Sequence, residues 1–292
     1  MELLFQSVDR AIDLLFHLHE QVEPRGVSEI ARALGLPKST VHRLLQALAR
    51  RGLVEQENGR YAPGAGLVAL GLGAQECDPV VAAARPVLDE EARALGETVF
   101  LMAPRSAGML VLDKAEGVGF LRAAPRLGEV VPLHATAAGK LAFAFAPERF
   151  PLESAGLEAF TERTLRDRDA LRAEVERARK QGFAENHGEW IDGLSVVAAP
   201  VLLDVAAGGR RLVAVLAVAA ATPRLRELGV SRVARRALEA VRRVQARLIG
   251  RSASEPASKR GSAARAASRP AARAAGPKGE RGRPRGRTEE RA

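Results

Sequence analysis

The sequence predicts an α+β protein: an N-terminal winged helix-turn-helix, a linker helix, a C-terminal α/β domain and a basic tail. Three observations support this division. Residues 27–51 hold two short helical patterns joined by a tight turn, an Asn-Gly pair separates two strand-like runs at 53–62, and strand-like runs alternate with helical ones after residue 97. The expected domain boundaries are 5–65, 66–78, 79–250 and 251–292.

The helix-turn-helix is predicted over residues 27–51. Its first helix has apolar residues at helical spacing, which are Ile30, Ala31 and Leu34. Gly35 can end this helix, and Pro37 keeps the preceding residue out of the α conformation before the second helix begins. Ser39 or Thr40 can then cap the second helix.

The second helix has the residue pattern of a DNA-recognition helix. Its apolar stripe consists of Val41, Leu44, Leu45 and Leu48. The other faces carry Arg and Gln side chains, which can bond base edges, and Lys, Ser and Thr side chains, which can hold phosphates. The structural alternative is a small helical bundle whose basic residues form a solvated face. The expected contacts with double-stranded operator DNA come from Ser28, Lys38, Ser39, Thr40, His42, Arg43, Gln46, Arg50 and Arg60.

Residues 53–62 predict a two-stranded wing. Asn58 and Gly59 separate short runs at 53–57 and 60–62, and an Asn-Gly pair favours the turn of a tight hairpin. A helix over residues 7–20 is expected to cover the other two helices. Its apolar side chains are Val8, Ile12, Leu14, Leu15 and Leu18.

Residues 66–75 have helical apolar spacing and predict a linker helix that packs against its counterpart in a dimer. A second helix is expected over 79–95, where Pro86 should kink or divide it. Strands in succession with inserted helices favour an α+β sheet that is open on one face. The expected strands are 98–103, 108–113, 119–124, 196–203 and 211–219, and the expected later helices are 168–181 and 230–249.

The net charge of +10 is concentrated at the C-terminal end of the chain. Residues 251–292 contain 12 Lys and Arg and 4 Glu, whereas residues 1–250 contain 33 basic and 31 acidic residues. DNA binding by the folded domains must therefore depend on local clusters of cations. The tail has no Val, Ile, Leu, Met or aromatic residue, so it cannot form a core and is expected to be disordered.

Residues 281–287 of this tail have the sequence RGRPRGR. An Arg-Gly-Arg-Pro core flanked by arginines is typical of an AT-hook, which lies in the narrow minor groove of A·T-rich DNA. Such a contact would use Arg281, Arg283, Pro284 and Arg285. Because the tail has low complexity, a generic polycationic segment is the alternative, and both hypotheses predict added non-specific affinity for DNA.

Several classes of protein are disfavoured by composition. A single cysteine, Cys77, excludes an internal disulfide and a metal site based on paired thiols. Glu2, Asp9 and Arg10 interrupt the first apolar residues, so the start does not resemble a signal peptide. No uncharged segment reaches membrane-spanning length, and a cytoplasmic protein without membrane contact is therefore expected. The absence of a serine nucleophile elbow, a Cys-His pair in a suitable context and a carboxylate pair on a defined scaffold argues against an enzyme.

Residues 134–140, HATAAGK, resemble a phosphate-binding loop only in part. That loop requires Gly at the position of His134 and Ser or Thr at the position of Leu141, so nucleotide hydrolysis is excluded. Small residues at a loop-to-helix junction can instead hold a carboxylate through the backbone N–H groups of Ala137, Ala138 and Gly139. A close-packed helix start that needs small side chains is the structural alternative.

A polar loop over residues 185–192 contains the only Trp of the chain and is suited to cover a small ligand. Its candidate ligand contacts are Asn186, His187 and Trp190. A metal site at His187 with two Glu residues is disfavoured, because the paired helical spacing of a zinc motif is missing.

Four segments resemble the IclR family of bacterial transcriptional regulators, in the same order and at similar spacings. They are SVDRAIDLLFHL, SEIARALGLPKSTVHRLLQALARRGLVE, LHATAAGKLAFAF and GFAENHGEWIDGLSVVAAPV. The resemblance covers residues 5 to 250 and implies a DNA-binding domain, a linker helix and a GAF-like domain that binds a small effector. It also implies a homodimer or a dimer of dimers, and repression is expected over activation. In this resemblance the HATAAGK junction and the loop 185–192 form opposite walls of the effector pocket.

The chain departs from the family on its last core strand, where hydroxyl groups of an S-V-S-G-P-like sequence often face the pocket. Alanines occupy most of these positions, so we expect a small organic acid with an anionic head at the helix start and an apolar or aromatic body. The same loss of hydroxyls leaves open a degenerate pocket in an architectural DNA-binding protein. The expected effector contacts are Leu121, Ala123, Ala137, Ala138, Gly139, Asn186, His187, Trp190, Val196, Ala217 and Ala219.

Overall fold

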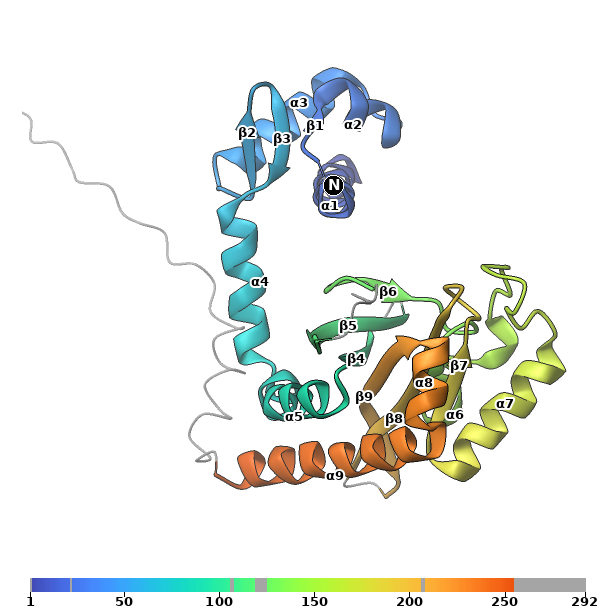
Figure 1. The fold of residues 1–292 in the computed structure, drawn as a ribbon. Coiled ribbons are helices and arrows are strands. Elements are labelled where there is room, and N and C mark those ends of the chain that lie inside the picture. The colour runs from blue at the N-terminus through green and yellow to red at the C-terminus, as the bar shows by residue number, and fades with distance from the viewer. Residues whose placement is uncertain (1, 22, 106–107, 119–124, 206–207, 255–292) are drawn as a thin grey trace, which may run out of the picture. The chain divides into compact units, whose positions relative to one another are not determined.

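The computed structural model describes residues 2–21, 23–105, 108–118, 125–205 and 208–254 (Figure 1). The predicted strand 119–124, with Leu121 and Ala123, lies outside the described residues, and so does the AT-hook candidate at 281–287. The DNA-binding part and the effector part are each described by themselves below.

The N-terminal part is a winged helix-turn-helix, as predicted. Its elements are α1 (Glu2–Glu20), β1 (Arg25–Gly26), α2 (Val27–Ala33), α3 (Lys38–Ala49), β2 (Val54–Glu57) and β3 (Arg60–Pro63). One apolar core joins the three helices to the wing, and its buried members are Leu14, Leu18, Ile30, Ala31, Val41, Leu45, Val54 and Tyr61.

The turn between α2 and α3 differs from the prediction at the helix cap. Gly35 adopts a left-handed φ of +64° and ends the first helix, as expected. Pro37 occupies the N-cap of α3, whose first turn has no side-chain cap. The predicted caps, Ser39 and Thr40, are wrong because the helix already begins at Lys38 and places both inside its first turn.

The wing forms as predicted, with one addition. Asn58 and Gly59 have φ values of +50° and +77°, the pair of positive values that a type I′ turn requires. Glu57 pairs with Arg60 across this turn. The short strand β1 pairs with β3 and makes a three-stranded sheet, an element too short to be predicted from periodicity.

Helix α1 covers the domain with only part of its predicted face. Leu14 and Leu18 are buried, but Val8 and Ile12 are about half exposed. Together with Phe16, these two residues recur every four positions and form a second apolar stripe that faces away from the core.

Two helices follow the wing, α4 (Ala65–Cys77) and α5 (Pro79–Leu95). The Asp78 carboxylate caps α5 by accepting the Val80 N–H at 2.8 Å. Pro86 does not divide α5, which continues as one helix with one face buried in the core of the effector part. Packing of that face outweighs the hydrogen bond that proline cannot donate.

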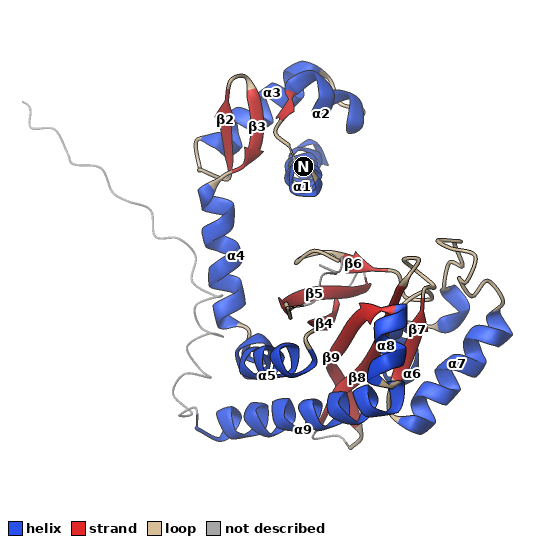
Figure 2. Cartoon of the chain, in the orientation of Figure 1, coloured by secondary structure: helices blue, strands red, loops and turns tan. Residues whose placement is uncertain are grey.

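The effector part contains a six-stranded antiparallel sheet with the order β6-β5-β4-β9-β8-β7 (Figure 2). Its strands are β4 (Thr98–Arg105), β5 (Gly108–Ala115), β6 (Val130–Val131), β7 (Ala184–His187), β8 (Leu194–Asp204) and β9 (Arg210–Ala221). Its later helical elements are α6 (Ala137–Phe145), the 3₁₀ turn Leu152–Ser154, α7 (Arg168–Gln181), α8 (Thr222–Leu228) and α9 (Val230–Ser254).

Helices cover both faces of this sheet, so the predicted open face is wrong. On β4, Val99 and Leu101 pack in one core with residues of α5, α8 and α9. The alternate residues Phe100 and Met102 pack in a second core with residues of α6 and α7. The central strands are apolar on both faces, which demands a helical layer on each side.

In the described part of the chain, no single helix is long and apolar enough to span a membrane. One bent pair, residues 65–75 with 79–95, meets the requirement in length and composition when its helices are taken together.

Candidate DNA-binding surface and ligand pocket

Helix α3 presents the predicted polar side chains to solvent. Val41 and Leu45 are fully buried and orient the helix on its core. His42 and Gln46, one helical turn apart, are joined by a side-chain hydrogen bond of 3.2 Å. The exposed predicted contacts on and beside this helix are Lys38, Ser39, His42, Arg43, Gln46 and Arg50, while Thr40 is half-buried.

The wing residue Arg60 has a role that the sequence did not indicate. Its Nε donates to the Pro24 carbonyl at 2.9 Å, and its Nη2 lies 3.1 Å from a Glu29 carboxylate oxygen. The Gly26 N–H and the Arg60 guanidinium hold the pKa of Glu29 below its ordinary value. Arg60 therefore ties the wing to the start of α2, where Ser28 is exposed.

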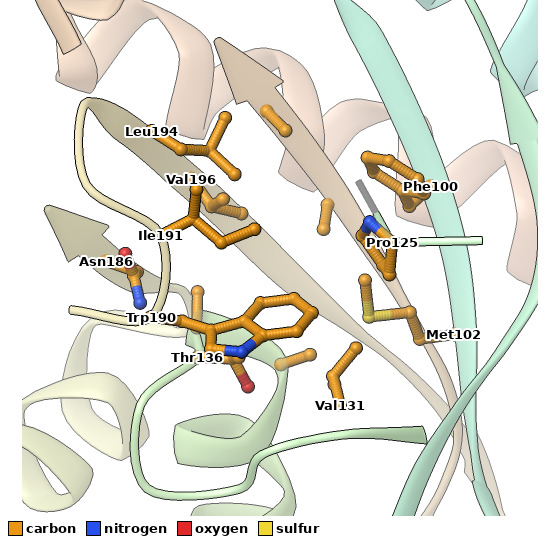
Figure 3. A pocket seen from close by; sticks show the side chains of 14 residues that line it. Phe100, Met102, Pro125, Val131, Thr136, Asn186, Trp190, Ile191, Leu194 and Val196 are labelled. Atoms are coloured by element: carbon orange, nitrogen blue, oxygen red, sulfur yellow. The ribbon is translucent and has the colours of Figure 1, made fainter. Parts of the chain in front are cut away.

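The effector part contains a mainly apolar pocket beside the start of α6 (Figure 3). It encloses about 430 Å³ of empty space, its open mouth included. Five strands, the start of α6 and the loop after β7 contribute side chains to it. The described lining residues are Phe100, Met102, Pro125, Val131, Thr136, Ala137, Ala138, Asn186, Trp190, Ile191, Leu194, Val196, Ala217 and Ala219.

Strand register explains the shape of this pocket. Phe100 on β4 lies directly opposite Ala217 on β9, and Val196 on β8 lies opposite Ala219. The two alanines thus form a shallow floor between larger neighbours. The predicted contacts Val196, Ala217 and Ala219 all line the pocket, and none of them presents a hydroxyl group.

The start of α6 provides the polar end of the pocket. Thr136 is the N-cap, and its hydroxyl accepts the Gly139 N–H at 3.1 Å and donates to the Pro132 carbonyl at 2.7 Å. Ala137 and Ala138 occupy the first two helical positions, whose N–H groups have no acceptor within a helix. Both residues line the pocket, as predicted.

The prediction that Gly139 offers a free N–H to a ligand is wrong. Its N–H is used by the cap, and Gly139 does not line the pocket. A Cβ atom at this position would lie 1.9 Å from the Leu133 carbonyl oxygen. Close packing, the structural alternative for this segment, therefore accounts for Gly139.

Strand β7 brings Asn186 to the pocket but not His187, and the loop after β7 brings Trp190. Alternation along the strand points Asn186 inward and His187 outward, where His187 pairs with Glu185 at 2.8 Å. The placement of His187 against an effector is therefore wrong. The buried Asn186 amide donates to the Ala135 carbonyl and accepts the Glu189 N–H at 3.3 Å, so it joins the loop to the start of α6.

Half of the lining residues were not predicted. Phe100 and Met102 alternate along a predicted strand, and this period of two was the available evidence that they share a face with a central pocket. The hydroxyl of Thr136, just before three small residues, was the evidence for a helix cap. The other residues missed are Pro125, Val131, Ile191 and Leu194. Among the described residues, no group of three or more His, Cys, Asp and Glu is arranged to hold a metal ion.

Two family profiles match the chain. The IclR helix-turn-helix domain matches residues 7–58, and the C-terminal domain of bacterial transcriptional regulator IclR matches residues 75–246. The chain belongs to the IclR family. It is therefore a DNA-binding transcription regulator with an effector-binding domain, and not an enzyme.

Curated relatives of this IclR-family regulator agree with the family match. The HTH-type transcriptional regulator XynR of Escherichia coli K12 is 34% identical over 203 residues, which cover 68% of this chain and 81% of the relative. The glycerol operon regulatory protein of Streptomyces coelicolor is 34% identical over 199 residues, which cover 67% of this chain and 78% of the relative. The transcriptional repressor IclR of Escherichia coli K12 is 30% identical over 201 residues, with coverages of 66% and 73%.

Solved structures confirm the fold of the regulator. An IclR-type regulator from Alicyclobacillus acidocaldarius matches with a TM-score of 0.72 at 27% identity and covers 83% of this chain and 98% of its own. An IclR homologue from Microbacterium hydrocarbonoxydans, complexed with 4-hydroxybenzoate, matches with a TM-score of 0.73 at 21% identity. It covers 84% of this chain and 99% of its own, a likeness of fold.

Proposed function

We propose that this regulator binds operator DNA through α3 and the wing, and that a small organic acid bound in the effector part changes this binding. The observation that carries the proposal is the junction at Thr136 to Ala138, where backbone N–H groups meet an apolar pocket. Positively polarised N–H groups at a helix start favour a carboxylate.

The apolar walls of the pocket indicate the chemistry of the ligand body beyond its carboxylate. Asn186 and Thr136 use their polar atoms within the protein, which leaves the N–H groups of Ala137 and Ala138 as the available backbone donors at the start of α6. Phe100, Trp190 and Met102 then surround the ligand body with apolar and aromatic surface. A carboxylate on a single ring or a short aliphatic chain satisfies both ends of this pocket.

The relatives supply a test compound and an expected direction of control. 4-Hydroxybenzoate, which occupies a protein of the same fold, combines a carboxylate with one aromatic ring and is the first ligand to test. Several relatives are named repressors, so repression is the expected outcome of operator binding. Because the operator lies on bacterial DNA, we place the regulator in the cytoplasm.

We also propose that the regulator acts as a homodimer. Apolar side chains on α4 are exposed, with Val68 at 57% and Leu72 at 55%, and these two residues share a helix face. Pairing of this face with a second copy would bury it and place two recognition helices on a palindromic operator.

The test measures operator affinity with and without 4-hydroxybenzoate. The operator is first obtained by footprinting the regulator on the DNA that flanks its own coding region. Ala138→Leu fills the ligand end of the pocket, so it should bind the operator normally and no longer respond to the ligand. Ala173→Leu, an exposed position on α7, is the matched control, and thermal melting verifies the fold of each variant.

Two results would contradict the proposal. A folded Ala138→Leu protein that responds fully to the ligand would place the effector elsewhere. Failure of 4-hydroxybenzoate, benzoate and short aliphatic carboxylates to bind the wild type would favour the degenerate pocket and the architectural function.

A further inference from the structure

The lysine that ends the HATAAGK segment is buried, and the proposed function does not use it. Lys140 is only 1% exposed, which is rare for a lysine. Its Nζ lies 2.7 Å from Oε1 of Glu189, 3.0 Å from the Glu185 carbonyl oxygen and 3.6 Å from Oε2 of Glu174. A single ammonium group on α6 therefore joins β7, the loop after it and α7.

Glu189 is held through its backbone as well as its side chain. Its N–H donates to the Asn186 side chain at 3.3 Å, and its carbonyl accepts the Thr164 hydroxyl at 2.6 Å. Thr161 donates to the Gly188 carbonyl at 2.7 Å, so the preceding residue is held too. The loop is thus attached to α6 on one side and to the segment at 161–164 on the other.

Burying the Lys140–Glu189 ion pair costs desolvation free energy. The second carboxylate oxygen of Glu189, Oε2, is buried without a hydrogen-bond partner among the described residues. An unpartnered buried oxygen costs free energy, and apolar residues of similar size often replace a buried ion pair without loss of stability. Stability alone is therefore a weak reason for Lys140 and Glu189 to be charged. A stronger reason is that an ion pair fixes the direction of the loop, which apolar packing does less well.

The residue that follows Glu189, Trp190, forms a wall of the pocket. Trp190 follows Glu189 directly in the chain, and its indole lies across the pocket beside Thr136 and Val131 (Figure 3). We propose that Lys140 is a positioning residue, whose ion pair with Glu189 holds the Trp190 wall against the start of α6 and thereby sets the affinity of the pocket for its ligand. The part concerning affinity rests on the proposed function, while the part concerning Trp190 does not.

Trp190 itself reports the outcome, because it is the only Trp of the chain. The experiment compares the emission maximum and acrylamide quenching of the ligand-free, full-length protein. Lys140→Met keeps an unbranched side chain only one atom shorter and removes its charge, so Trp190 should emit at longer wavelength and be quenched more strongly. Lys140→Arg, which keeps the charge, should lie closer to the wild type.

Two further variants keep the test decisive. Lys180→Met changes an exposed lysine on α7 that has no ion pair within the described ranges, and it should match the wild type. The double variant Lys140→Met with Glu189→Leu removes both charges of the buried pair, and Glu174 keeps Arg177 as an ion-pair partner, so the double variant should fold even where the single variant does not. Its Trp190 should still be quenched more strongly than in the wild type. Circular dichroism and thermal melting establish that each variant is folded.

Ligand affinity separates this proposal from the proposed function. For the folded Lys140→Met protein, binding of 4-hydroxybenzoate should weaken roughly tenfold, the loss expected when one well-placed contact is misaligned. If the wild type does not bind 4-hydroxybenzoate, the assigned ligand class fails, and Trp190 quenching still decides the role of Lys140. A folded single or double variant with wild-type emission and quenching would overturn the proposal.

Discussion

The Thr136 hydroxyl oxygen lies 3.1 Å from the backbone nitrogen of Gly139 and closes the third position of α6 to any ligand. The N–H groups of the two preceding alanines have no acceptor within this helix. Gly139 instead lies against the backbone of Leu133. Its place in the small-residue segment is thus explained by packing, while its neighbours provide the pocket.

Gly139→Ala should destabilise the effector part. Its new methyl group would overlap the Leu133 carbonyl, and overpacking of this kind costs about 3 kcal/mol when backbone must move. Gly156→Ala is the control, because a Cβ at that position meets no atom within 4 Å. Urea unfolding of both variants measures the difference. Equal stability of the two proteins would show that the start of α6 can shift at little cost.

Arg43→Ala should weaken operator binding by roughly 1 to 3 kcal/mol if its guanidinium bonds a guanine edge. Selection at one base pair of the operator should relax as well. Lys38→Ala is the comparison, because removal of a cation that holds phosphate weakens binding equally on every sequence. Fluorescence anisotropy on operator and random DNA provides the measurement. An equal loss on both DNAs for Arg43→Ala would assign it to phosphate and leave base recognition to other residues.

Leu72→Glu should convert the dimer to monomers. The substitution places a charge on the exposed apolar face of α4 that we assign to the dimer interface. Ala74→Glu, an exposed position on the other side of the same helix, provides a control for the added charge alone. Sedimentation equilibrium measures the mass in solution, and a dimeric Leu72→Glu protein would show that another surface joins the two copies.

Removal of residues 255–292, after the end of α9, should leave the folded domains and the choice of operator intact. The deleted segment is rich in arginine, so non-specific affinity for DNA should fall. The slope of log affinity against log salt should flatten by about 0.9 for each phosphate that the tail neutralises. An unchanged slope would show that the tail does not touch DNA.

The AT-hook hypothesis needs a matched pair of variants. Replacement of Arg281, Arg283 and Arg285 by Ala should abolish a preference for A·T-rich DNA if the hook forms. Replacement of Arg265, Arg269 and Arg273 removes the same charge and should preserve that preference. Equal effects of both variants would favour the generic polycationic segment.

Local patterns predicted the DNA-binding part well, since the signals for its helices and its wing each lie within a short stretch of sequence. Apolar spacing identified α2 and α3, and Asn58 with Gly59 identified the wing, because each depends on neighbouring residues. Patterns of this kind cannot show which strands are neighbours. Phe100 was missed for that reason, because its place in the pocket depends on β9, more than a hundred residues later.

Two predictions about residues near the pocket were wrong or incomplete, for different physical reasons. His187 was grouped with Asn186 because both lie in one polar segment, but the segment is a strand that turns successive side chains to opposite faces. Lys140 was considered only as part of a phosphate loop. Its partner Glu189 lies 49 residues away, and no local pattern connects the two.

The double burial of the central sheet has a mechanical consequence for β4. Phe100 borders the pocket, while the next residue, Leu101, packs in the core that contains α5. Leu101 is fully buried in that core, and close-packed interiors compress little, so we expect a ligand that displaces Phe100 to shift the residues that Leu101 contacts as well. A displacement of Phe100 on the pocket side of the sheet is thus transmitted to the α5 side through the peptide unit that joins Phe100 to Leu101.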